Sequence, residues 1–105
     1  MVPTLNDVQF DIRSQILRDY PDKDQQSLEY MMVLGLTEEA GEVAGIYKRK
    51  IRHFDRDLDR ITDDELKKEL GDVLWYLTGL CFVRGFTLEE VYDLNKKKLE
   101  GRYGR

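Results

Sequence analysis

Two pairs of acidic residues have a spacing that could hold a metal ion. Glu39 and Glu42 are separated by three positions, and Glu69 and Asp72 repeat this spacing. On a helix that turns about 100° per residue, the first pair straddles the apolar side and the second lies at the edge of an apolar side. One such pair alone is usually a solvated stripe. Because both pairs lie on or beside apolar faces, we expect the four carboxylates to point into a helical bundle.

Four ionised carboxylates that point into a bundle would repel one another strongly. At an effective dielectric constant near 20, each pair about 5 Å apart costs about 3 kcal/mol. Either some of them stay protonated or a cation lies among them. The single histidine, His53, and the single cysteine, Cys81, are far apart in the sequence, which argues against zinc and di-iron sites. Oxygen ligands alone select a hard ion, Mg²⁺ or Mn²⁺, and Mg²⁺ commonly binds phosphate oxygens, so a phosphate substrate is expected.

The first half of the chain predicts two helices. Thr4 can cap a helix with apolar positions spaced by three and four, which ends near Tyr20. Ser27 is a candidate cap for a second helix that runs to about Arg52 and carries the first acidic pair. Gly35 and Thr37 could mark a break or kink within this second helix.

The second half predicts two more helices after a short polar loop over residues 53–61. Thr62 and Thr87 each have a glutamate three positions later, which is the spacing of a capping box. Gly85 is expected to end the third helix in a left-handed cap, and the fourth ends near Gly101. With 105 residues, the chain is expected to form one domain, residues 1–105, with an all-α, four-helix bundle-like fold.

Residues 73–83 form a segment without a charge, so the third helix is apolar on all sides. Such a helix must be covered all round, and we expect a dimer, or a tetramer, to cover it. The alternative is a central helix that the other three helices wrap completely.

Composition excludes several classes of protein. The chain has 21 acidic and 17 basic residues and a net charge of −4, which argues against a nucleic-acid polymer as partner. No apolar run reaches the length of a membrane span, so no membrane contact is expected. The first residues lack the pattern of a signal peptide, and one cysteine cannot form a disulfide within the chain. We expect a cytoplasmic protein.

The two acidic motifs also resemble those of a known family. Glu38-Glu39-Ala40-Gly41-Glu42, followed by Glu69-Leu70-Gly71-Asp72, is similar to the EExxE…ExxD signature of MazG-like nucleoside triphosphate pyrophosphohydrolases. The resemblance covers roughly residues 28–103 and includes a closing N-x-x-K-L segment at Asn95, Lys98 and Leu99. This family is all-α.

The resemblance implies hydrolysis of a nucleoside or deoxynucleoside triphosphate at the α–β phosphoanhydride, which yields a monophosphate and pyrophosphate. Mg²⁺, with Mn²⁺ as a substitute, would be held by Glu39, Glu42, Glu69 and Asp72. Glu38 would lie at the edge of the cluster and hold an outer water or help to bind a second ion. Either Glu38 or Glu39 would activate the attacking water, and the sequence does not choose between them.

Several other residues are candidates for binding the substrate. Arg49 and Lys50 could meet phosphate oxygens, or they could be ordinary cations at a helix C-terminus. Lys98 and Arg102 could close over the triphosphate, or again serve a helix end, while Asn95 could bond the sugar or base. Tyr76, one turn after Asp72, could stack on the base or hold the ribose. The preferred base is not determined.

Two other functions remain open on the sequence alone. One is a phosphoribosyl-ATP pyrophosphohydrolase of the same fold. The other is a helical interaction module without enzymatic activity, whose acids receive basic residues of a partner.

Overall fold

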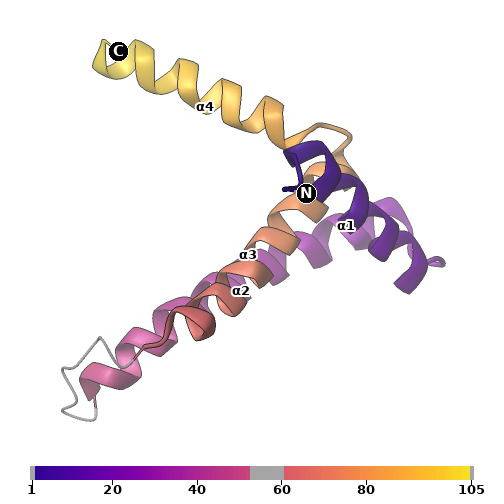
Figure 1. Ribbon diagram of the computed structural model, residues 1–105. Coiled ribbons are helices and arrows are strands. Elements are labelled where there is room, and N and C mark those ends of the chain that lie inside the picture. Colours follow the sequence, from indigo (N-terminus) through magenta and orange to yellow (C-terminus); the bar gives the residue numbers. More distant parts are fainter. Residues whose placement is uncertain (1, 53–60, 105) are drawn as a thin grey trace.

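Four α-helices form in the part of the chain that a computed structural model describes, residues 2–52 and 61–104. They are α1 (Leu5–Asp19), α2 (Gln25–Arg52), α3 (Asp63–Arg84) and α4 (Leu88–Tyr103) (Figure 1). No strand occurs in these ranges, which confirms the all-α class. The predicted loop over residues 53–61, with His53, lies outside the described residues except for Ile61. Within the described ranges, no helix is long and apolar enough to cross a bilayer.

Most helix ends follow the predicted local signals. The hydroxyls of Thr4, Thr62 and Thr87 accept hydrogen bonds from the backbone N–H three residues later, which satisfies a donor that the first turn leaves free. The capping box is reciprocal at Thr4 and Thr87. Gly85 ends α3 with φ of +81°, a conformation in which a glycine costs little.

Two predicted ends are wrong by two or three residues. Helix α2 begins before Ser27, because the carboxylate of Asp24 accepts the N–H of Ser27 at 2.7 Å and so serves the first turn. Helix α4 continues through Gly101 to Tyr103 and ends at Gly104, whose φ is +68°. In each case a nearby residue of equal capping ability serves the end of the helix.

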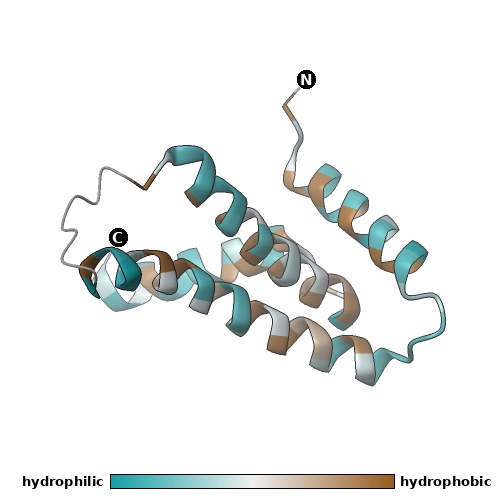
Figure 2. Cartoon of the chain, turned by 90° about the horizontal axis from the view of Figure 1, so that it is seen from below, coloured by the Kyte–Doolittle hydropathy of each residue, from teal (hydrophilic) through white to brown (hydrophobic). Residues whose placement is uncertain are grey.

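Helices α2 and α3 run antiparallel and form a hairpin, which is the longest packed unit of the chain (Figure 1). Helix α1 packs against the end of the hairpin that contains the start of α2 and the end of α3. Along α1, hydrophobic and hydrophilic residues alternate in bands, as expected for an amphipathic helix that lies on a surface (Figure 2).

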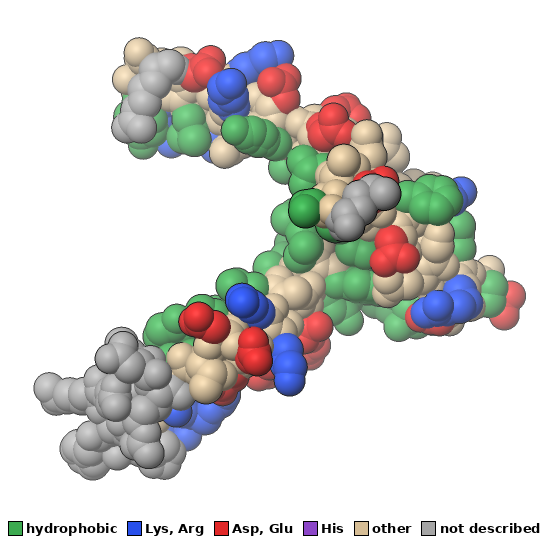
Figure 3. All heavy atoms as spheres, viewed as in Figure 1, with side chains coloured by type: hydrophobic (Ala, Val, Ile, Leu, Met, Phe, Trp, Pro, Cys, Tyr) green, Lys and Arg blue, Asp and Glu red, His purple; other side chains and the backbone are tan. Residues whose placement is uncertain are grey.

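Helix α4 projects away from the hairpin instead of completing a four-helix bundle (Figures 1 and 3). Its main helix contact is with α1, and from Glu89 onward its residues are exposed. The radius of gyration is 16.7 Å, whereas a compact domain of this length has about 13 Å. The bundle-like prediction therefore holds for α1, α2 and α3, and is wrong for α4 within one chain.

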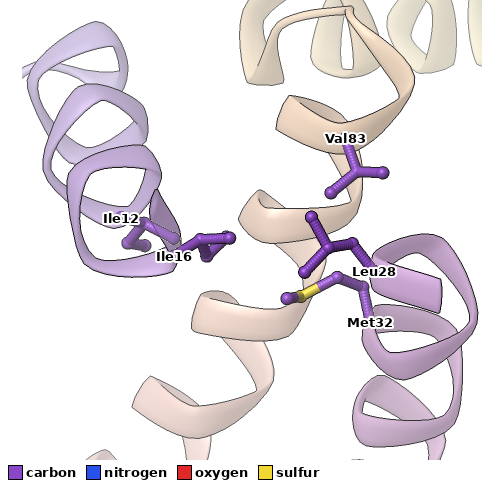
Figure 4. Close-up of a cluster of buried hydrophobic side chains, with 5 residues drawn as sticks. All are labelled: Ile12, Ile16, Leu28, Met32 and Val83. Carbon is purple, nitrogen blue, oxygen red and sulfur yellow. The ribbon is translucent and has the colours of Figure 1, made fainter. Parts of the chain in front are cut away.

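The hydrophobic core lies where α1 meets the hairpin. Its five buried residues come from three helices: Ile12, Ile16, Leu28, Met32 and Val83 (Figure 4). Trp75 packs against this cluster, and Cys81 is buried as a small apolar side chain, as its neighbours in the sequence suggest. Leu70 and Leu74 on α3 stay 49% and 43% exposed, so the other helices do not wrap α3 completely.

At Gly35, a side chain of α3 packs directly against the backbone of α2. A Cβ atom built on Gly35 would overlap the ring of Tyr76, whereas one on Gly41 would meet no atom within 4 Å. Helix α2 is continuous through Gly35 and Thr37, so the predicted break does not occur. The glycine makes room for an aromatic ring of the facing helix.

A methyl group at this position should therefore loosen the hairpin. We expect Gly35→Ala to lower the free energy of unfolding by about 1–3 kcal/mol, because the added Cβ overpacks the contact with Tyr76. The matched control Gly41→Ala, on the same helix, should raise it by up to about 1 kcal/mol through helix propensity. Denaturant unfolding followed by circular dichroism measures both. Equal effects of the two substitutions would contradict the close contact.

Candidate functional site

Carboxylates from α2 and α3 converge on the hairpin beyond the contact of Gly35 with Tyr76. One carboxylate oxygen each of Glu39, Glu69 and Asp72 lies within 4.8 Å of the other two. Glu39 comes from α2, and Glu69 and Asp72 come from successive turns of α3. The geometry thus brings together three of the four residues predicted to bind metal. We call these three residues the carboxylate cluster.

Glu42, the fourth predicted ligand, does not join this group of three. It lies one turn beyond Glu39 on α2 and is exposed. Its charge still acts on Glu39, whose pKa it helps to raise. Glu42 therefore lies at the rim of the cluster.

The cluster lies at the surface and not inside a bundle, contrary to the prediction. Glu39 and Glu69 are half-buried, while Asp72 and Glu38 are exposed. The reason is that α1 covers only the other half of the hairpin and α4 projects away, so no described helix closes over the acidic half. Water and a ligand can reach the carboxylates.

Glu39 lies among several negative charges that act on its pKa. Partial burial raises the pKa of Glu39, and neighbouring negative charges raise the pKa further: Asp72, Glu38, Glu69 and Glu42. No lysine or arginine forms an ion pair with these carboxylates in the described part of the chain. The missing counter-charge, the oxygen-only donors and their mutual distances fit a hard divalent cation.

Tyr76 forms the wall of the cluster on its core side. Its half-buried ring fills the space at Gly35 and meets the edge of Trp75 with a centroid separation of 5.0 Å and an interplanar angle of 77°. Burial raises the pKa of the Tyr76 hydroxyl, and the charges of nearby Glu39 and Asp72 raise the pKa further. The ring therefore lies next to the carboxylates, as its place one turn after Asp72 predicts.

The predicted cations on α2 lie beyond the acidic motif. The guanidinium of Arg49 folds back over Gly45, where its Nη1 would be 3.1 Å from an added Cβ. It thus points along the helix toward the turn that carries Glu42. Lys50 is half-buried, and neither cation forms an ion pair within the described ranges.

The predicted substrate residues of α4 are not next to the cluster in a single chain. Asn95, Lys98 and Arg102 are exposed on the projecting helix. Asn95 lines a shallow groove of about 310 Å³ to which only α4 contributes, together with Tyr92, Lys96, Leu99 and Glu100. Within one chain, the carboxylate cluster and the basic residues of α4 therefore lie apart, although both are predicted to bind the same substrate.

Two residues near the site did not emerge from the sequence as site residues. Gly35 was interpreted only as a helix breaker, although its place on the apolar face, one turn before Glu39, was a signal for a close contact. Gln15 on α1 accepts a hydrogen bond from the indole N–H of Trp75 at 2.9 Å. Nothing in the sequence distinguishes Gln15 from other polar residues of its helix.

From the raised pKa of Glu39 we predict how the stability of the metal-free protein depends on pH. A carboxyl whose pKa is raised by folding contributes stability below its ordinary pKa, and this contribution is lost as the pH rises through the raised value. We therefore expect Glu39→Gln to raise the melting temperature at pH 7 in the presence of a chelator, and the gain to shrink toward about pH 4. Asp22→Asn, in the turn between α1 and α2, should not show this pattern. A Glu39→Gln protein less stable than wild type at pH 7 would contradict the repulsion.

Two comparisons with known proteins match most of the chain. Residues 26–104 match the MazG nucleotide pyrophosphohydrolase domain. The Gene 37 protein of Mycobacterium phage L5 is 36% identical over 80 residues, which are 76% of this chain and 69% of the phage protein. No solved structure matches the chain significantly. The domain match covers both acidic motifs and most of the chain, and the chain therefore belongs to the MazG nucleotide pyrophosphohydrolase family.

Proposed function

We propose that the protein hydrolyses a nucleoside or deoxynucleoside triphosphate at the α–β bond, in a Mg²⁺-dependent reaction that yields a monophosphate and pyrophosphate. The observation that carries this proposal is the convergence of the Glu39, Glu69 and Asp72 carboxylates from two facing helices in a member of this family. We further propose that residues 1–105 act as one such domain, with a role in clearing unwanted nucleotides. A cytoplasmic location stays a prediction.

Glu39, Glu69 and Asp72 would hold the Mg²⁺, for which Mn²⁺ could substitute, and Glu42 would act from the rim. The ion supplies positive charge that neutralises phosphate oxygens and orients the reacting group. Glu38 is exposed beside Glu39 and lies outside the group of three oxygens. Because Glu39 is engaged with the metal in this arrangement, we assign the activation of the attacking water to Glu38.

The neighbouring residues suggest how the rest of the substrate is bound. Arg49, which points back toward the acidic motif, would meet phosphate oxygens, with Lys50 close behind it. The ring of Tyr76 would contact the base or the ribose beside the cluster. These assignments leave the identity of the base open.

We also propose that the protein acts as a homodimer or homotetramer. Its accessible surface is 8121 Å², about 2000 Å² more than the roughly 6100 Å² expected for a compact chain of this mass. A standard interface buries about 800 Å² per partner, so the excess is sufficient for at least one. Hydrophobic side chains gather in the notch between α4 and the hairpin, on the face shown in Figure 3. A second copy seated in this notch would cover them.

Such an assembly would also account for the substrate residues of α4. Among the described residues, Lys98 and Arg102 have no ion-pair partner, and no lysine or arginine pairs with the carboxylate cluster. We propose that α4 of one copy meets the site of another and that Asn95, Lys98 and Arg102 contact the substrate there.

The reaction is tested by incubating the protein with Mg²⁺ and a panel of nucleoside and deoxynucleoside triphosphates, with phosphoribosyl-ATP included. We expect a monophosphate and pyrophosphate as products, identified by chromatography. A diphosphate and phosphate would indicate another cleavage site. Turnover of phosphoribosyl-ATP alone would favour the alternative enzyme, and no turnover of any substrate would favour an interaction module.

Variants of the acids connect this activity to the cluster. Asp72→Asn should lower kcat by about 100-fold or more, because a charge that holds the metal is lost. It should also remove the rise in melting temperature that millimolar Mg²⁺ gives the wild-type protein. Asp64→Asn, an exposed acid at the start of α3, is the control and should keep both properties.

The assembly is tested by light scattering at micromolar concentration. We expect a particle of at least twice the 12.4 kDa chain mass, because a monomer would leave the notch exposed. A mass of one chain would contradict the proposal. If α4 acts on a second copy, mixing inactive Asp72→Asn with inactive Lys98→Ala/Arg102→Ala should restore activity, since a mixed dimer contains one intact site. Mixtures without activity would rule out this shared site.

A further inference from the structure

We propose that Gln15 on α1 is a positioning residue for the nucleotide: it holds the indole of Trp75, which in turn fixes the ring of Tyr76 beside the carboxylate cluster. This inference rests on the proposed function, because it takes Tyr76 to contact the nucleotide. It assigns to α1, which lies outside the matched residues 26–104, a role in nucleotide affinity.

The first step of the connection is a hydrogen bond between α1 and α3. Trp75 Nε1 donates to Gln15 Oε1 at 2.9 Å, and both side chains are half-buried. The amide nitrogen of Gln15 donates to Asp11 Oδ2 at 3.1 Å, which orients the amide so that its oxygen faces the indole. The indole nitrogen can only donate a hydrogen bond and never accepts one. Loss of the acceptor would therefore free the indole to turn.

The second step is the contact between two rings. Trp75 and Tyr76 meet edge to face at 5.0 Å, a favoured geometry for aromatic pairs. On its other side, the Tyr76 ring fills the space at Gly35. The ring is thus held between α2 and the indole, and a shift of the indole removes one of the contacts that fix it.

The third step is that Gln15 is bonded to Trp75 and not to the predicted metal ligands. Gln15 contacts neither the carboxylate cluster nor Glu38, and the hydrogen bond it makes to α3 is at Trp75. Its loss should therefore weaken nucleotide binding while the chemical step stays intact. The expected kinetic signature is a change in KM with little change in kcat.

The test uses Gln15→Met, which keeps the length of the side chain and removes the acceptor. We expect KM to rise about 2- to 10-fold, the effect of one hydrogen bond, with kcat within about 2-fold of wild type. Gln15→Glu keeps an acceptor for the indole but loses the bond to Asp11, so its KM should lie between those of wild type and Gln15→Met. Gln25→Met is the matched control, because it removes a 3.0 Å bond from α2 to the Val83 carbonyl at the far end of the hairpin. Its KM should not change.

A double-mutant cycle separates positioning from general loosening of the fold. Trp75→Phe removes the donor and should raise KM as Gln15→Met does, and it serves as the test if Gln15→Met fails to fold. Combining the two should add no further increase in KM, because both remove the same bond. Independent, additive effects, or an unchanged KM in Gln15→Met, would overturn the inference.

A binding readout makes failure of this inference distinct from failure of the proposed function. Trp75 is the single tryptophan of the chain, so its emission reports on this part of the site. In wild type, titration with a non-hydrolysable α,β-methylene triphosphate should change the emission, and Gln15→Met should raise the Kd by the same factor as KM. An active wild type with equal Kd in Gln15→Met contradicts only the positioning role. A wild type that neither binds nor hydrolyses triphosphates overturns both proposals.

Discussion

The contact between Gly35 and Tyr76 fixes how α2 and α3 lie against each other, and the site depends on this register. The absent side chain at Gly35 lets an aromatic ring of α3 reach the backbone of α2. Because the two helices are antiparallel, each turn forward along α2 lies opposite the preceding turn of α3. One turn beyond Gly35, Glu39 therefore arrives opposite Asp72, one turn before Tyr76. A single steric fit thus places carboxylates from two helices together.

The hairpin is divided by this contact into a half that stabilises the fold and a half that holds the site. On one side, α1 covers apolar residues of both helices and forms the core. On the other side no helix among the described residues covers the acids, so water and salt moderate their repulsion. This arrangement leaves the cluster accessible to a cation and a charged substrate. The same rigid helices serve both halves, so the buried half supports the geometry of the exposed one.

Local signals predicted the helices well because caps act within a few residues of one another. Thr4, Thr62, Thr87 and Gly85 each do what their type and spacing indicate. The errors at Ser27 and Gly101 have one cause: Asp24 and Gly104 offer the same chemistry nearby, and packing decides which of two equivalent residues is used. The predicted course of α4 was wrong for a different reason. Local signals indicate where a helix begins and ends, but not which surface it packs against.

The sequence by itself determined the four helices, the pairing of acids at helical spacing and the family, because these depend on residue types and short separations along the chain. Only the tertiary structure decided that Glu39, Glu69 and Asp72 meet while Glu42 stays at the rim, and that the cluster lies at the surface. It also decided that Gln15 bonds Trp75 across 60 residues. Such facts depend on which faces of separate helices come together, and that is settled by the fit of side chains such as Tyr76 against Gly35.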